Sequence, residues 1–289
     1  MKEFKTYHPI VNFIYFLLVI GLSMFLMHPV SLGITLFCAV IYIAVLKGKK
    51  AAFISILSAV PVMLLGAVIN PLFNHEGVTV ITYLKSGNPL TLEAFYYGIA
   101  AATMLVAVII HFSSYNEVMT SDKFIYLFGR IIPSLALVIS MTLRFVPTFI
   151  ARLREIKTVQ KTLGVTMSEG SLINRIRSAT KILSILITWS LENAVETADS
   201  MKSRGYGLSG RTAYSIFRFE KRDAAALLWM TVLTIIIFWR ISRGALLYTY
   251  FPAFTIGKFS IGIHIAYFLL CITPIIIETR EAIRWKAIK

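Results

Sequence analysis

Long apolar stretches are the feature of this sequence that most limits what the chain can fold into. Hydrophobic residues make up 57% of its 289 residues and charged residues only 15%, whereas a soluble domain is nearer half apolar and a quarter charged. A helix needs about 20 apolar residues to cross the hydrocarbon core of a bilayer. The sequence therefore predicts an all-α, polytopic membrane protein with about six spans, near residues 10–27, 30–46, 51–69, 93–112, 224–240 and 258–277. The first stretch is expected to remain in the mature protein, because no small-residue cleavage pattern follows it and further spans come after it.

The placement of the positive charge predicts the orientation of the chain. The net charge is +15, and most lysines and arginines flank the apolar stretches, which fits membrane orientation better than nucleic-acid binding. Cytoplasmic loops of membrane proteins carry an excess of these residues. The two termini and residues 47–50 are basic, whereas residues 70–92 contain Lys85 as their only basic residue. We therefore expect both termini on the cytoplasmic side of a bacterial-type plasma membrane. The loop with Arg240, Arg243 and Lys258 disagrees, because it would then face outward.

Residues 124–223 form a region that we expect to stay on the cytoplasmic side. Its first part is apolar enough to cross, but a crossing would place Arg152, Arg154 and Lys157 outside, against the orientation rule. Further on, apolar residues such as Ile173 and Ile176 recur at intervals of three and four, which is typical of helices with one apolar face. We predict about four spans in residues 1–123, about three cytoplasmic helices against membrane lipid in 124–223, and about two spans in 224–289.

Two basic helices in this region are predicted to end at glycines. The segment "TVQKTLGVT" ends at Gly164, and "SMKSRGYGLSGRT" follows a helix expected from about Arg175 to Arg204, with Gly205 as its stop. Arg204 could simply be a capping residue, since a helix dipole favours a cation in the last turn. However, glycine also lets another backbone approach closely, and an arginine can hold a carboxylate with two hydrogen bonds. Two such ends favour a device that docks on an acidic protein partner.

Four segments, in this order, resemble one family of transport proteins. The outward loop "NPLFNHEGVTVI" and the helix "SLALVISMTLRFVP" are followed by "VQKTLG" and "SMKSRGYGLSGRT". They are similar to segments of the T component of energy-coupling factor transporters, the family of EcfT and CbiQ. The last two segments resemble its two coupling motifs, and the second segment resembles its Arg-Phe-x-Pro helix through Arg144, Phe145 and Pro147. The resemblance covers the chain to about Asp223.

The resemblance implies where partner subunits bind. The residues that contact the ATPases would be Ser203, Arg204 and Gly205 at the second tip, and Thr162, Leu163 and Gly164 at the first. Leu163 stands where the first motif usually has arginine, so only Arg204 is expected to form the forked ion pair. We expect supporting roles for Arg144, Pro147, Lys161, Tyr206 and Arg211, and a structural one for Arg144 in particular, at lipid headgroups or at carbonyls freed by Pro147.

The resemblance also implies a complex in which this chain is not an enzyme. Two ATP-binding subunits (EcfA-like or CbiO-like) would hydrolyse ATP with Mg²⁺, and an S component would bind a vitamin or a metal ion. This chain would bind no cofactor. In agreement, the sequence has no G-x-x-x-x-G-K-[ST] phosphate loop.

Other functions remain as alternatives at this point. One is the permease subunit of a conventional ABC importer, although no Ile-x-Leu-Pro stretch follows Gly164. Another is a membrane enzyme or an independent channel, which would want carboxylates or histidines at membrane depth. The two cysteines lie in apolar runs and the five histidines lack ligand spacing, so we expect neither a disulfide nor a metal site; these residues are Cys38, Cys271, His8, His28, His75, His111 and His264.

Overall fold

The chain is helical and divides into two compact units. The computed structural model describes residues 4–85, 87–129, 131–162, 172–208, 217–244, 248–256 and 260–288. Unit 1 comprises Met1–Phe124 and Phe217–Lys289, and unit 2 comprises Ile125–Ile216. Unit 1 contains the short 3-10 helix η1 (Phe4–Thr6), six long helices and the start of α5 (Ser121–Gly129). The long helices are α1 (Pro9–Phe25), α2 (Pro29–Lys47), α3 (Lys49–Phe73), α4 (Leu92–Val118), α8 (Lys221–Ile241) and α9 (Ile261–Ile288). Unit 2 contains α6 (Pro133–Thr162) and α7 (Leu172–Ser203).

Each of the six stretches predicted to span the membrane forms one helix of unit 1. The described chain has six helices long and apolar enough to cross a bilayer: α2, α3, α4, α6, α8 and Ile261–Arg280 of α9. This set differs from the prediction at two places. Helix α1 has 17 residues and falls at the lower limit of spanning length. Helix α6 meets the length and composition of a span although we expected its residues to stay on the cytoplasmic side, and that placement stays a prediction.

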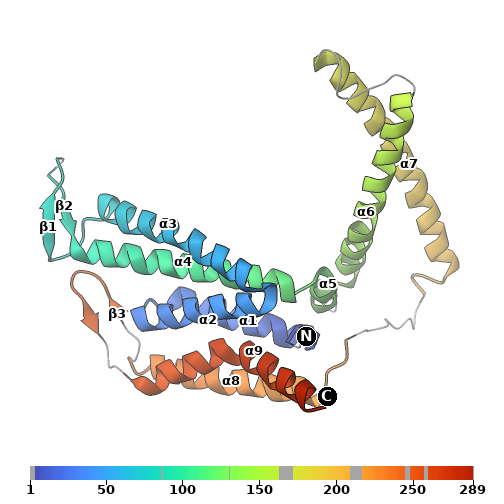
Figure 1. The fold of residues 1–289 in the computed structure, drawn as a ribbon. Coiled ribbons are helices and arrows are strands. Elements are labelled where there is room, and N and C mark those ends of the chain that lie inside the picture. Colours follow the sequence, from blue (N-terminus) through green and yellow to red (C-terminus); the bar gives the residue numbers. More distant parts are fainter. Residues whose placement is uncertain are drawn as a thin grey trace. The chain divides into compact units, whose positions relative to one another are not determined.

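Two short β-hairpins interrupt the helical pattern of unit 1. Strand β1 (Val80–Tyr83) pairs antiparallel with β2 (Pro89–Thr91), and β3 (Tyr248–Thr249) pairs antiparallel with β4 (Thr255–Ile256). Figure 1 shows both hairpins at one end of unit 1 and the two chain termini at the other. Next to the first hairpin, the buried carboxylate of Glu93 accepts a hydrogen bond from the Thr79 N–H, with an N–O distance of 3.1 Å. This hydrogen bond explains how a carboxylate can be buried at the beginning of an apolar helix.

Aromatic side chains from three helices and η1 fill the core of unit 1. Phe4, Tyr15, Phe16, Tyr42 and Tyr267 are at most 1% exposed and belong to one hydrophobic cluster. The hydroxyls of Tyr15 and Tyr267, but not that of Tyr42, are bonded by neighbouring helices. The Tyr15 hydroxyl donates to the Cys271 carbonyl at 2.8 Å, and the Tyr267 hydroxyl lies 2.7 Å from Thr35 Oγ1. Cys38 and Cys271 are buried and free. The hydrogen bonds of Tyr15 and Tyr267 fit a core that water does not reach, where an unpaired hydroxyl is costly.

Helices α3 and α4 approach each other backbone to backbone. A Cβ atom added to Gly66 would lie 2.8 Å from the carbonyl oxygen of Gly98, and one added to Gly98 would lie 2.8 Å from the Asn70 side chain. Small residues at helix contacts permit this closeness in membranes, where packing replaces the hydrophobic effect as the force between helices.

The N-terminal segment Phe4–His8 binds three buried charged side chains from other parts of unit 1. The Phe4 N–H donates to Glu278 Oε1 of α9 at 3.2 Å. The Lys123 ammonium of α5 donates to the Lys5 carbonyl, and the His8 N–H donates to Asp223 Oδ1 of α8 at 3.0 Å. Burial and the neighbouring Lys5 charge lower the pKa of Lys123 to about 8.

Asp223 has a second role at the beginning of α8. Its Oδ2 accepts the Glu220 N–H at 2.9 Å, and the Glu220 side chain in turn accepts from the backbone of Asp223, so the two residues form a reciprocal capping box. The side chain of Asp223 is thus bonded through both oxygens, and the residue is 1% exposed. Asp223 therefore holds α8 and the N-terminal segment together.

We predict that Asp223→Ala destabilises unit 1 more than a surface change would. The substitution leaves the His8 and Glu220 N–H groups without their acceptor, and hydrogen bonds to charged groups contribute about 1.5–3 kcal/mol each. We expect a clear fall in the melting temperature of the purified chain in detergent, measured by circular dichroism. A change at an exposed position of the same helix, Arg222→Gln, leaves both of these hydrogen bonds in place and should lower the melting temperature less. An Asp223→Ala variant as stable as the parent would contradict this role.

Candidate functional site

Helices α6 and α7 of unit 2 bury few side chains against each other. Among the described residues of unit 2, only Ile156, Gln160 and Ile182 are buried. In contrast, large apolar side chains are exposed along one side of α7, at spacings typical of a helix face: Ile173, Ile176, Leu183, Ile187, Leu191 and Val195. Exposed apolar surface of this extent marks a contact with protein or membrane. The amphipathic pattern predicted for these residues is therefore present, with its apolar face uncovered.

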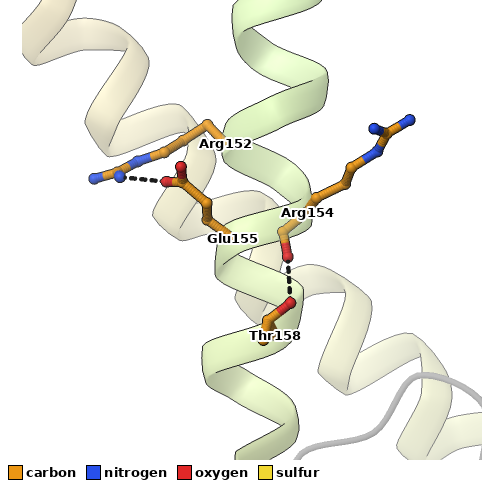
Figure 2. A network of polar contacts seen from close by, with 4 residues as sticks. All are labelled: Arg152, Arg154, Glu155 and Thr158. Carbon is orange, nitrogen blue, oxygen red and sulfur yellow. Dashed lines mark hydrogen bonds and ion pairs between the residues drawn. The ribbon is translucent and has the colours of Figure 1, made fainter.

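A cross-helix contact joins the middle of α6 to α7. The Phe149 ring meets the Trp189 ring edge to face, with centroids 5.6 Å apart, and the Arg152 guanidinium lies 5.6 Å from the Trp189 ring centroid. Arg152 also donates to Glu155 at 2.7 Å, as Figure 2 shows, whereas the Arg154 side chain extends away from this pair. One turn further, the Thr158 hydroxyl donates to the Arg154 carbonyl. Only Arg152 of these two arginines therefore stands over an aromatic ring of α7.

Helix α7 ends in the hydrogen-bond pattern of a Schellman motif. The Tyr206 N–H donates to the Met201 carbonyl at 3.0 Å, and the Gly205 N–H donates to the Lys202 carbonyl at 2.9 Å. Gly205 has a φ of +75°, the left-handed conformation that the motif requires. The predicted glycine stop at Gly205 is thus present.

Arg204 occupies the C-cap position of α7, and its side chain is exposed. Its N–H still bonds to the Ser200 carbonyl at 3.2 Å, which is the last helical hydrogen bond. The Ser203 hydroxyl donates to the same carbonyl at 2.9 Å, and Tyr206 is 43% exposed. The backbone therefore caps the helix, and the guanidinium of Arg204 projects from a fixed turn with its surface accessible.

The end of α6 is described only as far as Thr162. The Thr162 hydroxyl donates to the Val159 carbonyl at 2.7 Å, and Lys161 is exposed in the last turn. Leu163 and Gly164, and likewise Arg211 beyond the second tip, lie outside the described residues. The first coupling tip therefore stays a prediction. Arg144 and Pro147 lie within α6, where Arg144 is exposed and its carbonyl accepts from the Thr148 hydroxyl at 3.5 Å.

Sequence reasoning missed the role of one aromatic residue in unit 2. Trp189 is the residue of α7 that contacts both Phe149 and Arg152. A signal was available, because Trp189 is the only tryptophan in residues 124–223 and falls seven residues after Ile182, which is two helical turns. In the described part of the chain, no group of three or more His, Cys, Asp or Glu side chains could hold a metal ion.

Comparison with known proteins identifies the family. The model of the CbiQ family, described as cobalt transport protein, matches residues 5–214. The chain is also similar to "Energy-coupling factor transporter transmembrane protein EcfT" of three bacteria. It is 38% identical to that of Lactobacillus helveticus over 103 residues, which is 35% of this chain and 37% of the relative. It is 38% identical to that of Lacticaseibacillus paracasei over 104 residues, 36% of this chain and 39% of the relative. For Bacillus selenitireducens the identity is 42% over 94 residues, 32% of this chain and 35% of the relative.

These matches agree with the resemblance found in the four sequence segments. The chain spans little more than a third of the length of the EcfT proteins it matches, while the family match extends over more than half of this chain. Members of this group are non-catalytic transmembrane subunits. The multi-pass membrane protein described here therefore belongs to the CbiQ family of cobalt transport proteins.

Proposed function

We propose that this chain is the T component of an energy-coupling factor importer. The family match over residues 5–214 carries the proposal, because it includes both predicted coupling tips, Thr162–Gly164 and Ser203–Gly205, together with Arg144 and Arg211. In such a complex, two ATP-binding subunits hydrolyse ATP with Mg²⁺, and an S component binds the substrate, a vitamin or a metal ion. The T component joins the two and binds no cofactor. The family match favours this role over the permease of a conventional ABC importer.

The end of α7 is suited to hold an ATP-binding subunit. Arg204 is exposed at a C-cap whose backbone is fixed by the two hydrogen bonds of the Schellman motif. A guanidinium presents a planar fork that matches a carboxylate, and a partner that covers this pair would exclude water from it. Truncating one member of such a pair costs about 2–5 kcal/mol of binding free energy. We therefore assign Arg204 as the main ionic contact to the ATPase.

The first tip would make a different kind of contact. Leu163 offers an apolar side chain in place of a guanidinium, and Lys161 supplies a charge nearby. Docking there would be less specific in direction than at Arg204, because an ammonium is a point charge and a leucine forms no ion pair. Both tips belong to helices that contact each other through Trp189 and Arg152. Movement of the ATPases would thus be passed to α6 and α7 together and then to the S component.

The distribution of charge supports a cytoplasmic placement of the tips. In unit 1 the termini lie at one end and the hairpins at the other (Figure 1). The end with the termini carries Lys5, Lys47, Lys49, Lys50 and Lys123, whereas the hairpin end carries Lys85, Arg240 and Arg243. The excess of lysine favours the cytoplasm for the first end. ATP is available there, as docking on ATP-binding subunits requires.

Reversing the charge of Arg204 should abolish transport. We expect Arg204→Glu to lower the affinity for the ATP-binding subunits by about 30-fold or more, because a carboxylate would repel the acidic partner group. Substrate uptake by cells and co-purification of the ATPases would measure this, with membrane insertion unchanged. Arg154→Glu is a matched control, since Arg154 is also exposed and lies in the same unit. Normal uptake by the Arg204→Glu variant would argue strongly against the role of this residue.

The shape of the turn should matter as much as its charge. Gly205→Val would force a β-branched residue into a left-handed conformation, which costs about 1–2 kcal/mol, and should loosen the end of α7. Gly205→Asn should be tolerated better, because asparagine adopts this conformation more readily. Amide hydrogen exchange of residues 203–206 should quicken in the first variant and change less in the second. Equal exchange in both variants would show that the turn does not depend on the glycine.

Cysteine labelling in intact cells tests the orientation. Cys38 and Cys271 are buried, so the parent chain should react little with a membrane-impermeant maleimide. We expect Lys85→Cys to react from outside and Arg204→Cys to react only after the membrane is opened. Labelling of Arg204→Cys in intact cells would place the tip outside and refute the coupling role.

A further inference from the structure

A cavity between α8 and α9 combines apolar walls with two arginines. Its volume is about 300 Å³. Ala225 and Trp229 line it from α8, and Ile276 from α9. Arg222 and Arg280 line it as well. None of these residues belongs to the coupling tips.

The two arginines lie at the same end of this cavity. Helices α8 and α9 pack antiparallel, because the hairpin β3–β4 connects them and Arg240 at the end of α8 lies 3.5 Å from Ser260 just before α9. Arg222 precedes Trp229 by seven residues and Arg280 follows Thr273 by seven, and seven residues of helix rise by about 10 Å. The cavity is therefore basic at the end with the chain termini and apolar toward the middle of the helices.

The charge of these arginines is only partly compensated. Arg222 pairs through Nε with Glu220 at 3.0 Å, and its guanidinium lies 5.1 Å from the Tyr7 ring centroid. The Arg222 side chain is 42% exposed, so its guanidinium remains accessible beside that ion pair. Arg280 is exposed. The nearby carboxylates of Asp223 and Glu278 are buried and bonded to backbone N–H groups, and neither residue lines the cavity.

The apolar walls continue onto a surface that a membrane would cover. Trp229 is 44% exposed, and Leu228 and Ile276 beside it are also exposed. Basic pockets between membrane helices bind anionic headgroups. An amphiphile with one negative charge matches both parts of the cavity. A protein partner would need a far larger surface than this cavity offers.

We propose that this cavity binds one anionic phospholipid. The phosphate group lies between Arg222 and Arg280, and an acyl chain follows Trp229 and Ile276 toward the middle of the bilayer. The site is independent of the proposed transport function, because it requires this chain and a membrane alone. A bound lipid would join the first turn of α8 to the last turns of α9, next to the N-terminal segment that contacts both helices.

Quenching of Trp229 by brominated lipid tests the proposal. The full chain is prepared with Trp189, Trp239 and Trp285 replaced by phenylalanine and placed in phosphatidylcholine nanodiscs. Phosphatidylglycerol with dibrominated acyl chains is then titrated in, and phosphatidylcholine with the same brominated chains serves as reference. We expect Trp229 to be quenched at a lower mole fraction of phosphatidylglycerol than of phosphatidylcholine. Equal quenching by the two lipids overturns the proposal.

Variants of the two arginines and of the cavity locate the site. Arg222→Gln with Arg280→Gln should lower the preference for phosphatidylglycerol about 30-fold, since each basic residue near an anionic lipid surface contributes about a factor of five. The corresponding double change to lysine keeps the charge and should keep most of the preference. Arg240→Gln with Arg243→Gln, at the other end of α8, should leave it unchanged. Ala225→Phe fills the cavity without changing charge and should weaken quenching by both lipids. Two results would show that the arginine charges do not bind lipid here. One is that the double glutamine variant retains the preference for phosphatidylglycerol. The other is that the double lysine variant loses this preference as fully as the double glutamine variant does.

Discussion

The structure of unit 1 depends on the way in which its N-terminal segment is held by buried charges. Within Phe4–His8, the N–H groups of Phe4 and His8 donate to Glu278 and Asp223, and the Lys5 carbonyl accepts from Lys123; the three side chains come from three different helices. A buried charge is tolerated only when it is paired or hydrogen-bonded, so these three side chains and the N-terminal backbone require one another. Lys123 and Asp223 also lie close to the two points, at residues 124 and 217, where the chain passes between the units. The segment thus fixes both ends of the connection to unit 2 on the unit 1 side.

The two units are stabilised in different ways. Unit 1 has an aromatic core in which the Tyr15 and Tyr267 hydroxyls are bonded to neighbouring helices, and the close contact of Gly66 with Gly98 holds α3 against α4. Unit 2 buries three described residues and exposes an apolar face on α7. Much of the stability of unit 2 is therefore expected to come from what covers it. If partner proteins complete the packing of unit 2, then binding or release of a partner changes the conformation of unit 2. Unit 2 is therefore suited to transmit movement of its partners.

The sequence was sufficient to predict the helices and the family, and less informative about details of packing. The lengths of the apolar stretches were enough to predict all six long helices of unit 1. In lipid every backbone N–H and C=O group must be hydrogen-bonded within the protein, and a helix achieves this within one segment. Gly205 was correctly predicted as a helix stop because few residues besides glycine adopt its conformation. The β-hairpins were not predicted, because strands of two to four residues are too short to show an alternating pattern. Nor could spacing reveal the bonds of Asp223 and Lys123 to the N-terminal segment, which join residues more than 100 positions apart.

The length of α7 has a consequence for how far its end can travel. A helix of 32 residues measures about 48 Å at a rise of about 1.5 Å per residue. If such a rod pivots near its first turn, a rotation of about 5° displaces its far end by about 4 Å, which is more than the length of a hydrogen bond. A small rotation at the start of α7 therefore produces a larger displacement at Arg204. Conversely, a displacement applied at Arg204 produces only a small movement at the start of α7.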